Sequence, residues 1–160
     1  MLIFNKFKVF AFLFLVMLSC SEKIEKNEFR YSEDFFRYLE EVHRIEYEEN
    51  TLFYLLDLQS CDPCIDANLK MLSELDRISN LTIILLAKPR FDKWDNELKK
   101  LFERQNILED ANSEAYLFEL GLGKPMILYS VKKGEVFNYV SVSDFEIDKA
   151  EHFISNYAKY

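Results

Sequence analysis

The chain is poor in the residues that metal sites and nucleic-acid surfaces require. Only three cysteines and two histidines occur among its 160 residues, and neither His43 nor His152 stands at a ligand-like spacing from Cys61 and Cys64. Two thiols do not complete the four-ligand shell of zinc, so no metal site is expected. Lys and Arg number 20 against 28 Asp and Glu, a formal net charge of −8. This acidic balance disfavours binding to nucleic acid or to an anionic membrane surface, because both attract cations.

A long apolar run is also lacking. The stretch "VFAFLFLVML" (9–18) has ten apolar residues, and a ten-residue helix rises only ~15 Å, about half of a hydrocarbon core of roughly 30 Å. With Lys6 and Lys8 in front of it, the stretch is typical of a secretory signal peptide. It ends in "MLSC" (17–20), which resembles the bacterial lipobox, although Met17 stands where leucine is usual. The resemblance implies that Cys20 is lipidated and becomes the first residue of the mature chain; the alternative is an ordinary signal peptide cut nearby.

These observations predict three parts: a lipoprotein signal peptide (1–19), a lipid anchor and charged tether (20–31), and one folded domain (32–160). Removal of residues 1–19 leaves 18 basic and 28 acidic side chains, a net charge of −10. If Cys20 carries lipid, the remaining thiols are Cys61 and Cys64. Export would place them where a disulfide can form and persist.

What the chain has in quantity is apolar and aromatic side chains, and these predict a globular α/β domain without repeats. Hydrophobic residues make up 49%, including fifteen Phe and nine Tyr. Short apolar runs indicate buried strands, and apolar residues at helical spacing indicate helices. Strands are predicted at 51–58, 81–87, 125–131 and 136–142, the last two joined by the turn "KKGE"; helices are predicted at 32–45, after the cysteines to about 78, and at 94–105, 113–120 and 143–160. Strands that alternate with helices before a closing hairpin describe a mixed sheet covered on both faces.

The motif "CDPC" (61–64) lies where the first strand passes into a helix. Pro63 is tolerated in a first helical turn, because its missing N–H breaks no hydrogen bond there. A thiol at a helix N-terminus faces free N–H groups and the positive end of the dipole, and both favour the reactive thiolate. This position predicts Cys61 as the nucleophile and Cys64 as the resolving thiol. A disulfide across two residues constrains the unfolded chain little, so a redox role is preferred over a structural one.

The order strand, C-x-x-C, helix, strand, and later a proline leading into a hairpin and a final helix resembles the thioredoxin-like superfamily. The resemblance covers about residues 32–160 and implies that Pro125 is a cis-proline that binds substrate backbone, with Lys124 beside it. The insertion between the second strand and Pro125 has room for an extra helix and a short strand near "NILED" (106–110). It is similar to the TlpA-like branch, whose members are commonly exported, membrane-anchored oxidoreductases.

The chain departs from the family pattern at two places near the cysteines. Ser60 stands where tryptophan is usual, and Leu55 stands at the position of a buried aspartate. Asp57 is expected to be a strand-end residue satisfied by solvent. Two nearby charges are expected to have opposite effects on a Cys61 thiolate. The carboxylate of Asp62 would repel the thiolate, whereas the ammonium of Lys124 would stabilise it if the fold brings Lys124 close. His43 is expected at the surface of a charged helix, and Trp94 in the core.

The leading hypothesis is a protein-disulfide oxidoreductase of the bacterial cell envelope, anchored by lipid at Cys20 and facing the periplasm. It would use the redox-active Cys61–Cys64 disulfide without any further cofactor. Its partners would be the thiols and disulfides of exported proteins, a membrane-bound thiol redox partner and the membrane, with no nucleic acid. The competing hypothesis is a thioredoxin-fold accessory module in which the disulfide is permanent. A copper-handling relative is a third possibility, weakened by the lack of a third ligand.

Overall fold

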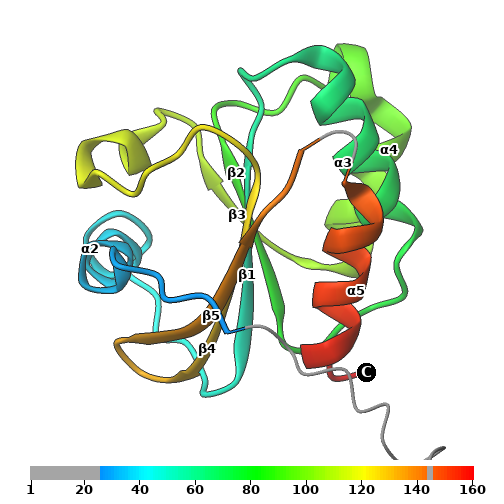
Figure 1. Cartoon of the computed structure of the whole chain (residues 1–160). Coiled ribbons are helices and arrows are strands. Elements are labelled where there is room, and N and C mark those ends of the chain that lie inside the picture. Colours follow the sequence, from blue (N-terminus) through cyan, green and yellow to red (C-terminus); the bar gives the residue numbers. More distant parts are fainter. Residues whose placement is uncertain (1–25, 144–145) are drawn as a thin grey trace, which may run out of the picture.

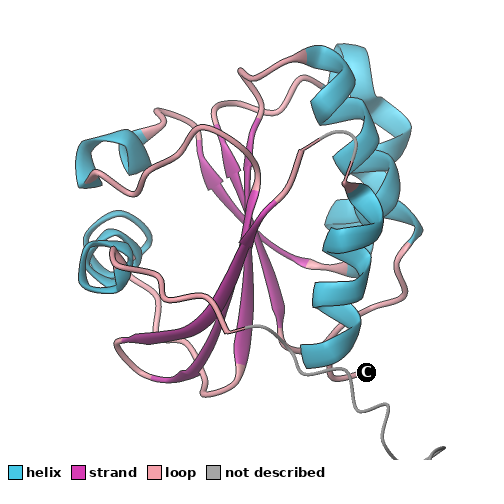
Figure 2. Ribbon diagram, in the orientation of Figure 1, coloured by secondary structure: helices cyan, strands magenta, loops and turns pink. Residues whose placement is uncertain are grey.

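A mixed sheet between two layers of helices forms the folded part of the chain (Figures 1 and 2). The structure is a computed structural model, and it describes residues 26–143 and 146–160. Along the chain the elements are α2 (Ser32–Tyr38), the π-helical turn η1 (Leu39–His43), β1 (Thr51–Asp57), α3 (Asp62–Glu74), β2 (Leu81–Leu86), α4 (Phe91–Arg104), β3 (Asn106–Asp110), the 3-10 helix η2 (Glu114–Phe118), β4 (Met126–Lys132), β5 (Glu135–Ser141) and α5 (Ile147–Tyr157).

The sheet has the strand order β3-β2-β1-β4-β5. β1 pairs in parallel with β2, and β2 with β3, whereas β4 runs antiparallel to both β1 and β5. The predicted fold class is therefore confirmed: the domain is α/β with a mixed sheet flanked by helices, and its topology is compatible with a thioredoxin-like fold. The extra helical segment predicted between the second strand and the strand after Pro125 is present as α4 and η2.

The central strand β1 is buried on both faces, as its unbroken apolar run predicts. Successive side chains of a strand point to opposite faces. Leu52, Tyr54 and Leu56 accordingly pack with α3, α4 and α5, whereas Phe53 and Leu55 pack with α2 and η2. Figure 1 shows the same division, with α3, α4 and α5 on one side of the sheet and α2 on the other. The two cores bury both faces of β1, so the end of this strand is a rigid point from which to present the cysteines.

Three elements differ in detail from the sequence predictions. The α-helix that begins at Ser32 ends at Tyr38 and continues as a π-helical turn. α4 begins at Phe91, three residues before Trp94, whose non-helical backbone angles (φ −126°, ψ 40°) kink the helix. The segment predicted as a helix at 113–120 is a short 3-10 helix, Glu114–Phe118, bounded by left-handed residues at Ser113 and Glu119.

The packed domain starts before the predicted boundary at residue 32. Phe29 is only 5% exposed and belongs to the core on the α2 side of the sheet. The backbone N–H of Asn27 donates to Oδ1 of Asn138 at 2.8 Å. Residues 27–31, predicted to be part of the tether, are therefore attached to the domain. The predicted signal peptide and Cys20 lie outside the described residues, and among those described no helix is long and apolar enough to cross a membrane.

Candidate functional site at the Cys61–Cys64 disulfide

The two cysteines form a disulfide at the start of α3, four residues after β1 ends at Asp57. Their Cα atoms are 5.3 Å apart, within the usual range for a disulfide. Cys61 is the N-cap residue, and its Sγ accepts a hydrogen bond from the backbone N–H of Cys64 at 3.3 Å. Cys61 is exposed and Cys64 is half-buried. The cysteine predicted to be the nucleophile is therefore the more exposed of the two.

The helix that follows makes this position favourable for a thiolate. α3 has 13 residues, and Pro63 lies in its first turn, where a free N–H is not needed. The N–H of Cys64 already points at Sγ of Cys61. In the reduced protein this N–H and the helix dipole would stabilise negative charge on that sulfur. The roles of Cys61 as the attacking thiol and Cys64 as the resolving thiol stay a prediction, for which this position is suitable.

Asp57 holds the loop between β1 and the disulfide, so the expectation that solvent satisfies it is wrong. Its carboxylate accepts hydrogen bonds from the backbone N–H of Gln59 at 2.8 Å and from the hydroxyl of Tyr116 at 2.6 Å. Its backbone carbonyl accepts from the Ser60 hydroxyl at 2.9 Å. Partial burial, the hydrogen bond to Asp57 and the charge of that carboxylate raise the pKa of Tyr116 to about 12. The expectation failed because Tyr116 comes from η2, 59 residues away in sequence.

A pocket of about 250 Å³ lies beside the residue that precedes the disulfide. It brings Ser60 together with Lys124 and Pro125, the two residues that the family resemblance implicated in substrate binding. Strand pairing explains this proximity, because Met126, the residue after Pro125, pairs with Leu55 near the end of β1. Leu55 is 1% exposed and gives the pocket an apolar wall. The lining residues are Leu55, Asp57, Ser60, Leu86, Tyr116, Leu122, Gly123, Lys124 and Pro125.

The implied cis geometry of Pro125 is not found. The Lys124–Pro125 peptide bond is trans, as are the other peptide bonds of the described residues. The carbonyl of Pro125 accepts a hydrogen bond from the N–H of Val142 at 2.8 Å, which extends the pairing of β4 with β5. Pro125 is thus the entry residue of a regular strand, where proline is tolerated. The resemblance implied a proline close to the cysteine motif, and Pro125 lies beside Ser60. It also implied a cis peptide bond before Pro125, and this bond is trans.

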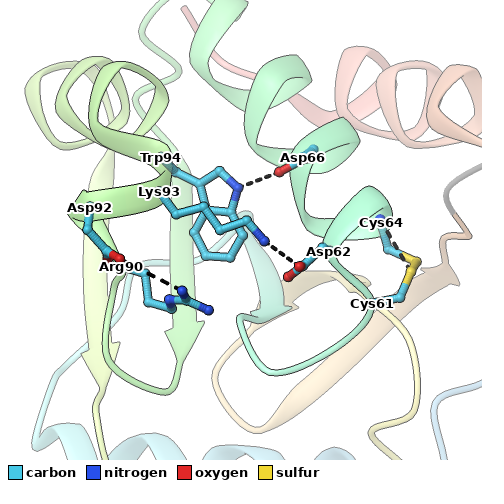
Figure 3. Close-up of polar contacts among 8 residues, drawn as sticks. All are labelled: Cys61, Asp62, Cys64, Asp66, Arg90, Asp92, Lys93 and Trp94. Atoms are coloured by element: carbon cyan, nitrogen blue, oxygen red, sulfur yellow. Dashed lines mark hydrogen bonds and ion pairs between the residues drawn. A yellow bond between two sulfur atoms is a disulfide. The ribbon is translucent and has the colours of Figure 1, made fainter.

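Asp62, between the cysteines, forms an ion pair that the sequence analysis missed (Figure 3). Nζ of Lys93, at the start of α4, contacts Oδ2 of Asp62. The hydrogen bond from Lys93, followed by the charges of Lys93 and Arg90, holds the pKa of the Asp62 carboxyl below its usual value. Asp62 is therefore ionised but compensated. No local pattern signals this pair, because 31 residues separate its members and the approach of α4 to α3 brings them together.

A second polar cluster lies on the α2 side of the sheet, and it corrects the expectation for His43. Nε2 of this half-buried histidine lies 2.9 Å from the hydroxyl of Tyr38, which donates to Oδ2 of Asp110 at 3.2 Å. Asp110 is 2% exposed and also accepts the N–H groups of Glu114 and Ala115. Burial lowers the pKa of His43, although Asp110 and Glu114 oppose the shift. The cluster anchors η2, which carries Tyr116, to the end of β3.

The described residues contain no group of three or more His, Cys, Asp and Glu side chains placed to hold a metal ion. Trp94 is 4% exposed and belongs to the core, as expected. In comparisons with known proteins, no family model matches the chain and no match is found among curated proteins. Function must therefore be inferred from the geometry around the disulfide: an exposed half-cystine at a helix N-terminus, near a pocket lined by Lys124 and Pro125.

Proposed function

We propose that this protein is a thiol-disulfide oxidoreductase of the thioredoxin-like, TlpA-like kind, exported and held at a membrane by lipid on Cys20. The observation that carries the proposal is the position of Cys61: it caps α3, is exposed, and forms a disulfide with Cys64. A structural disulfide would add little here, because closing so short a loop stabilises a fold by no more than about 2 kcal/mol. The placement suits a bond that opens and closes.

In the reducing direction, the dithiol form transfers two electrons to a substrate disulfide. The Cys61 thiolate attacks one substrate sulfur, and the other leaves as a thiolate that takes up a proton. The Cys64 thiol loses its proton and attacks Sγ of Cys61, which releases the first substrate sulfur as a thiol. The protein ends as the Cys61–Cys64 disulfide, and the substrate has gained two electrons and two protons. In the cell, a membrane-bound dithiol partner would restore the dithiol form; in the oxidising direction every step reverses.

The pocket beside Ser60 supports the proposal because a substrate chain must lie next to the sulfur under attack. Lys124 is exposed and Pro125 is buried at its edge. Lys124 forms no ion pair with another residue in the described part of the chain, so its ammonium is available to a substrate. Partners would be exported proteins with thiols or disulfides. No metal or organic cofactor takes part in the proposed exchange.

The test is reduction of insulin with dithiothreitol as the electron source, followed by the turbidity of the released B chain. The wild-type protein should accelerate the reaction, and Cys61→Ser should abolish the acceleration. Pre-reduced Cys64→Ser, mixed with insulin after removal of dithiothreitol, should instead accumulate a mixed disulfide between Cys61 and insulin, and Ser60→Ala should retain activity. If the wild-type protein gives no acceleration and its disulfide resists strong reductant, the accessory-module hypothesis replaces the enzyme. The apolar side chain of Leu55, at the position of the family's buried acid, favours that second candidate.

Anchoring has a separate test. Cells expressing the full chain should incorporate labelled palmitate into the protein, and the label should disappear in Cys20→Ala. Labelling that persists in this variant would contradict the assignment of Cys20 as the lipidated residue.

A further inference from the structure

We propose that Lys93 is a positioning residue for the redox pair: by compensating Asp62, it sets the ionisation of Cys61 and with it the oxidising strength of the Cys61–Cys64 couple. The inference rests on the proposed function, since it concerns how the same disulfide is tuned. Lys93 does not contact the sulfur atoms in its own right. Its charge offsets that of the carboxylate that lies between the two cysteines.

The negative charge of Asp62 disfavours a thiolate on Cys61 unless a cation offsets it. Asp62 is the first residue of α3 and follows Cys61 directly. A carboxylate there stabilises the helix through the dipole. It also repels a thiolate on the neighbouring cysteine, because two like charges at close range disfavour ionisation of the second group. An uncompensated Asp62 would therefore oppose the favourable effect of the helix N-terminus on Cys61.

Lys93 is held in place from two sides (Figure 3). Nζ contacts the Asp62 carboxylate and lies 4.7 Å from the centre of the Trp94 ring. That ring is buried, and its Nε1–H donates to Oδ1 of Asp66, one turn further along α3. The Lys93 side chain is only 27% exposed, whereas Asp62 is 61% exposed. The ammonium group is thus fixed against α3 by packing and a cation–π contact as well as by charge.

The kink of α4 provides this placement. Trp94 has non-helical backbone angles, and the N–H groups of Lys93 and Trp94 both bond to the carbonyl of Arg90 at 3.0 Å. The first turn of α4 is therefore set off from the rest of the helix. As a result Trp94 lies in the core while Lys93, its neighbour, reaches Asp62.

The other charged groups near the cysteines either pair with residues other than Asp62 or line the pocket beside Ser60. Arg90 pairs with Asp92 at 3.8 Å and contributes a weaker attraction to Asp62. Asp66 accepts from Trp94, and Asp57 accepts from Tyr116. Lys124 lines the pocket beside Ser60. Lys93 is the cation that contacts the carboxylate between the cysteines, so its removal should change the field at Cys61 most directly.

The expected effect follows from a single charge. In a water-exposed site, a unit charge several ångströms from a sulfur changes the thiolate population on the order of threefold to tenfold. Loss of Lys93 should raise the pKa of the Cys61 thiol and make the disulfide a weaker oxidant, since the thiolate form of the reduced protein loses stabilisation. A threefold to tenfold change in the exchange equilibrium corresponds to roughly 15–30 mV, because a tenfold change is about 30 mV for two electrons.

The experiment compares Lys93→Met with Lys93→Arg and with Lys99→Met in the purified protein. Lys99 is the matched control, because it forms an ion pair with Asp95 at 2.7 Å within α4 itself. Two quantities are measured at low salt: the pKa of Cys61, from the pH dependence of its alkylation rate, and the equilibrium of the couple with glutathione. Lys93→Met should raise the pKa of Cys61 and make the disulfide a weaker oxidant of glutathione. Lys93→Arg and Lys99→Met should stay near the wild-type values. Asp62→Asn should shift both in the opposite direction, and Asp62→Asn/Lys93→Met should lie between the two single variants.

Unchanged pKa and equilibrium in Lys93→Met would overturn the inference, as would an equal shift in Lys99→Met. A shift that persists undiminished at 1 M salt would also overturn it, because charges at the surface are screened within about 3 Å at that salt concentration. Thermal unfolding of each variant separates a local charge effect from loss of the fold. If Lys93→Met shifts the couple while the wild-type protein fails to reduce insulin, the inference holds and the proposed enzymatic function fails.

Discussion

Removal of the Tyr54 hydroxyl tests whether the first turn of α3 is tied to the sheet by a buried polar bridge. The hydroxyl donates to Oδ1 of Asn68, and Nδ2 of Asn68 donates to the carbonyl of Cys64 at 2.7 Å. Tyr54 and Asn68 are both fully buried. Burial raises the pKa of Tyr54 far above its usual value, so the hydroxyl stays protonated and able to donate. The bridge links β1 to the helix turn that carries Cys64.

The variant Tyr54→Phe should lower the free energy of unfolding by about 1–3 kcal/mol. The ring and its apolar contacts remain, so the loss comes mainly from leaving the Asn68 oxygen buried without a donor. For a domain of this size, a loss near 2 kcal/mol corresponds to a fall in melting temperature of roughly 4–8 °C.

Urea unfolding of the oxidised protein, followed by far-UV circular dichroism, measures this difference. Tyr129→Phe is the control, because the Tyr129 hydroxyl donates to Oδ1 of Asn50 at 3.0 Å in a partly accessible place where water can replace it. The control should lose less than about 1 kcal/mol. If Tyr54→Phe loses no more than Tyr129→Phe at an equal m-value, the bridge does not hold α3 against β1 and the reasoning is refuted.

Three further predictions concern the disulfide and the cluster around Asp110. Reduction of Cys61–Cys64 should lower the free energy of unfolding by at most about 2 kcal/mol in urea titrations, and a larger loss would indicate a structural disulfide. Asp110→Asn should cost about 2–4 kcal/mol by the same measurement, because Tyr38 and two backbone N–H groups lose a charged acceptor. Burial lowers the pKa of His43 from 6.5, so its contribution to stability is present above pH 6.5 and is lost as pH falls through the lower folded-state pKa. The wild-type protein should therefore lose more stability than His43→Gln between pH 7 and 5, and parallel pH curves would contradict the assignment of a lowered pKa to this half-buried histidine.

Much of the fold could be predicted from local signals. β1, β2, β4 and β5 are apolar runs bounded by turn residues, and their residues alternate between two cores as a strand requires. α3 follows Cys61 with a proline in its first turn and an apolar stripe behind it. Such signals depend on neighbours within one or two turns of chain, so they are readable without knowledge of the tertiary structure. The start of α4 was placed too late because its kink at Trp94 interrupts the helical pattern.

The candidate site was only half predictable. Cys61, Cys64 and the approach of Pro125 followed from the motif and the resemblance, and the pocket places Pro125 beside Ser60, the residue before Cys61. The hydrogen bond of Asp57 to Tyr116 and the ion pair of Asp62 with Lys93 did not follow. Both partners belong to the insertion between β2 and β4, whose path over the sheet carries no signal in the residues near the cysteines.

By itself, the sequence determined an α/β domain with a disulfide-forming pair at the start of a helix, because hydrophobic periodicity and helix-start preferences act over a few residues. Only the tertiary structure decided which charges face that pair. Coulomb energy depends on distance in space, and packing of α4 against α3 brings Lys93 to Asp62 across 31 positions of chain. The motif thus supplies the two sulfur atoms and the Asp62 carboxylate, while the cation that faces this carboxylate comes from an element remote in sequence.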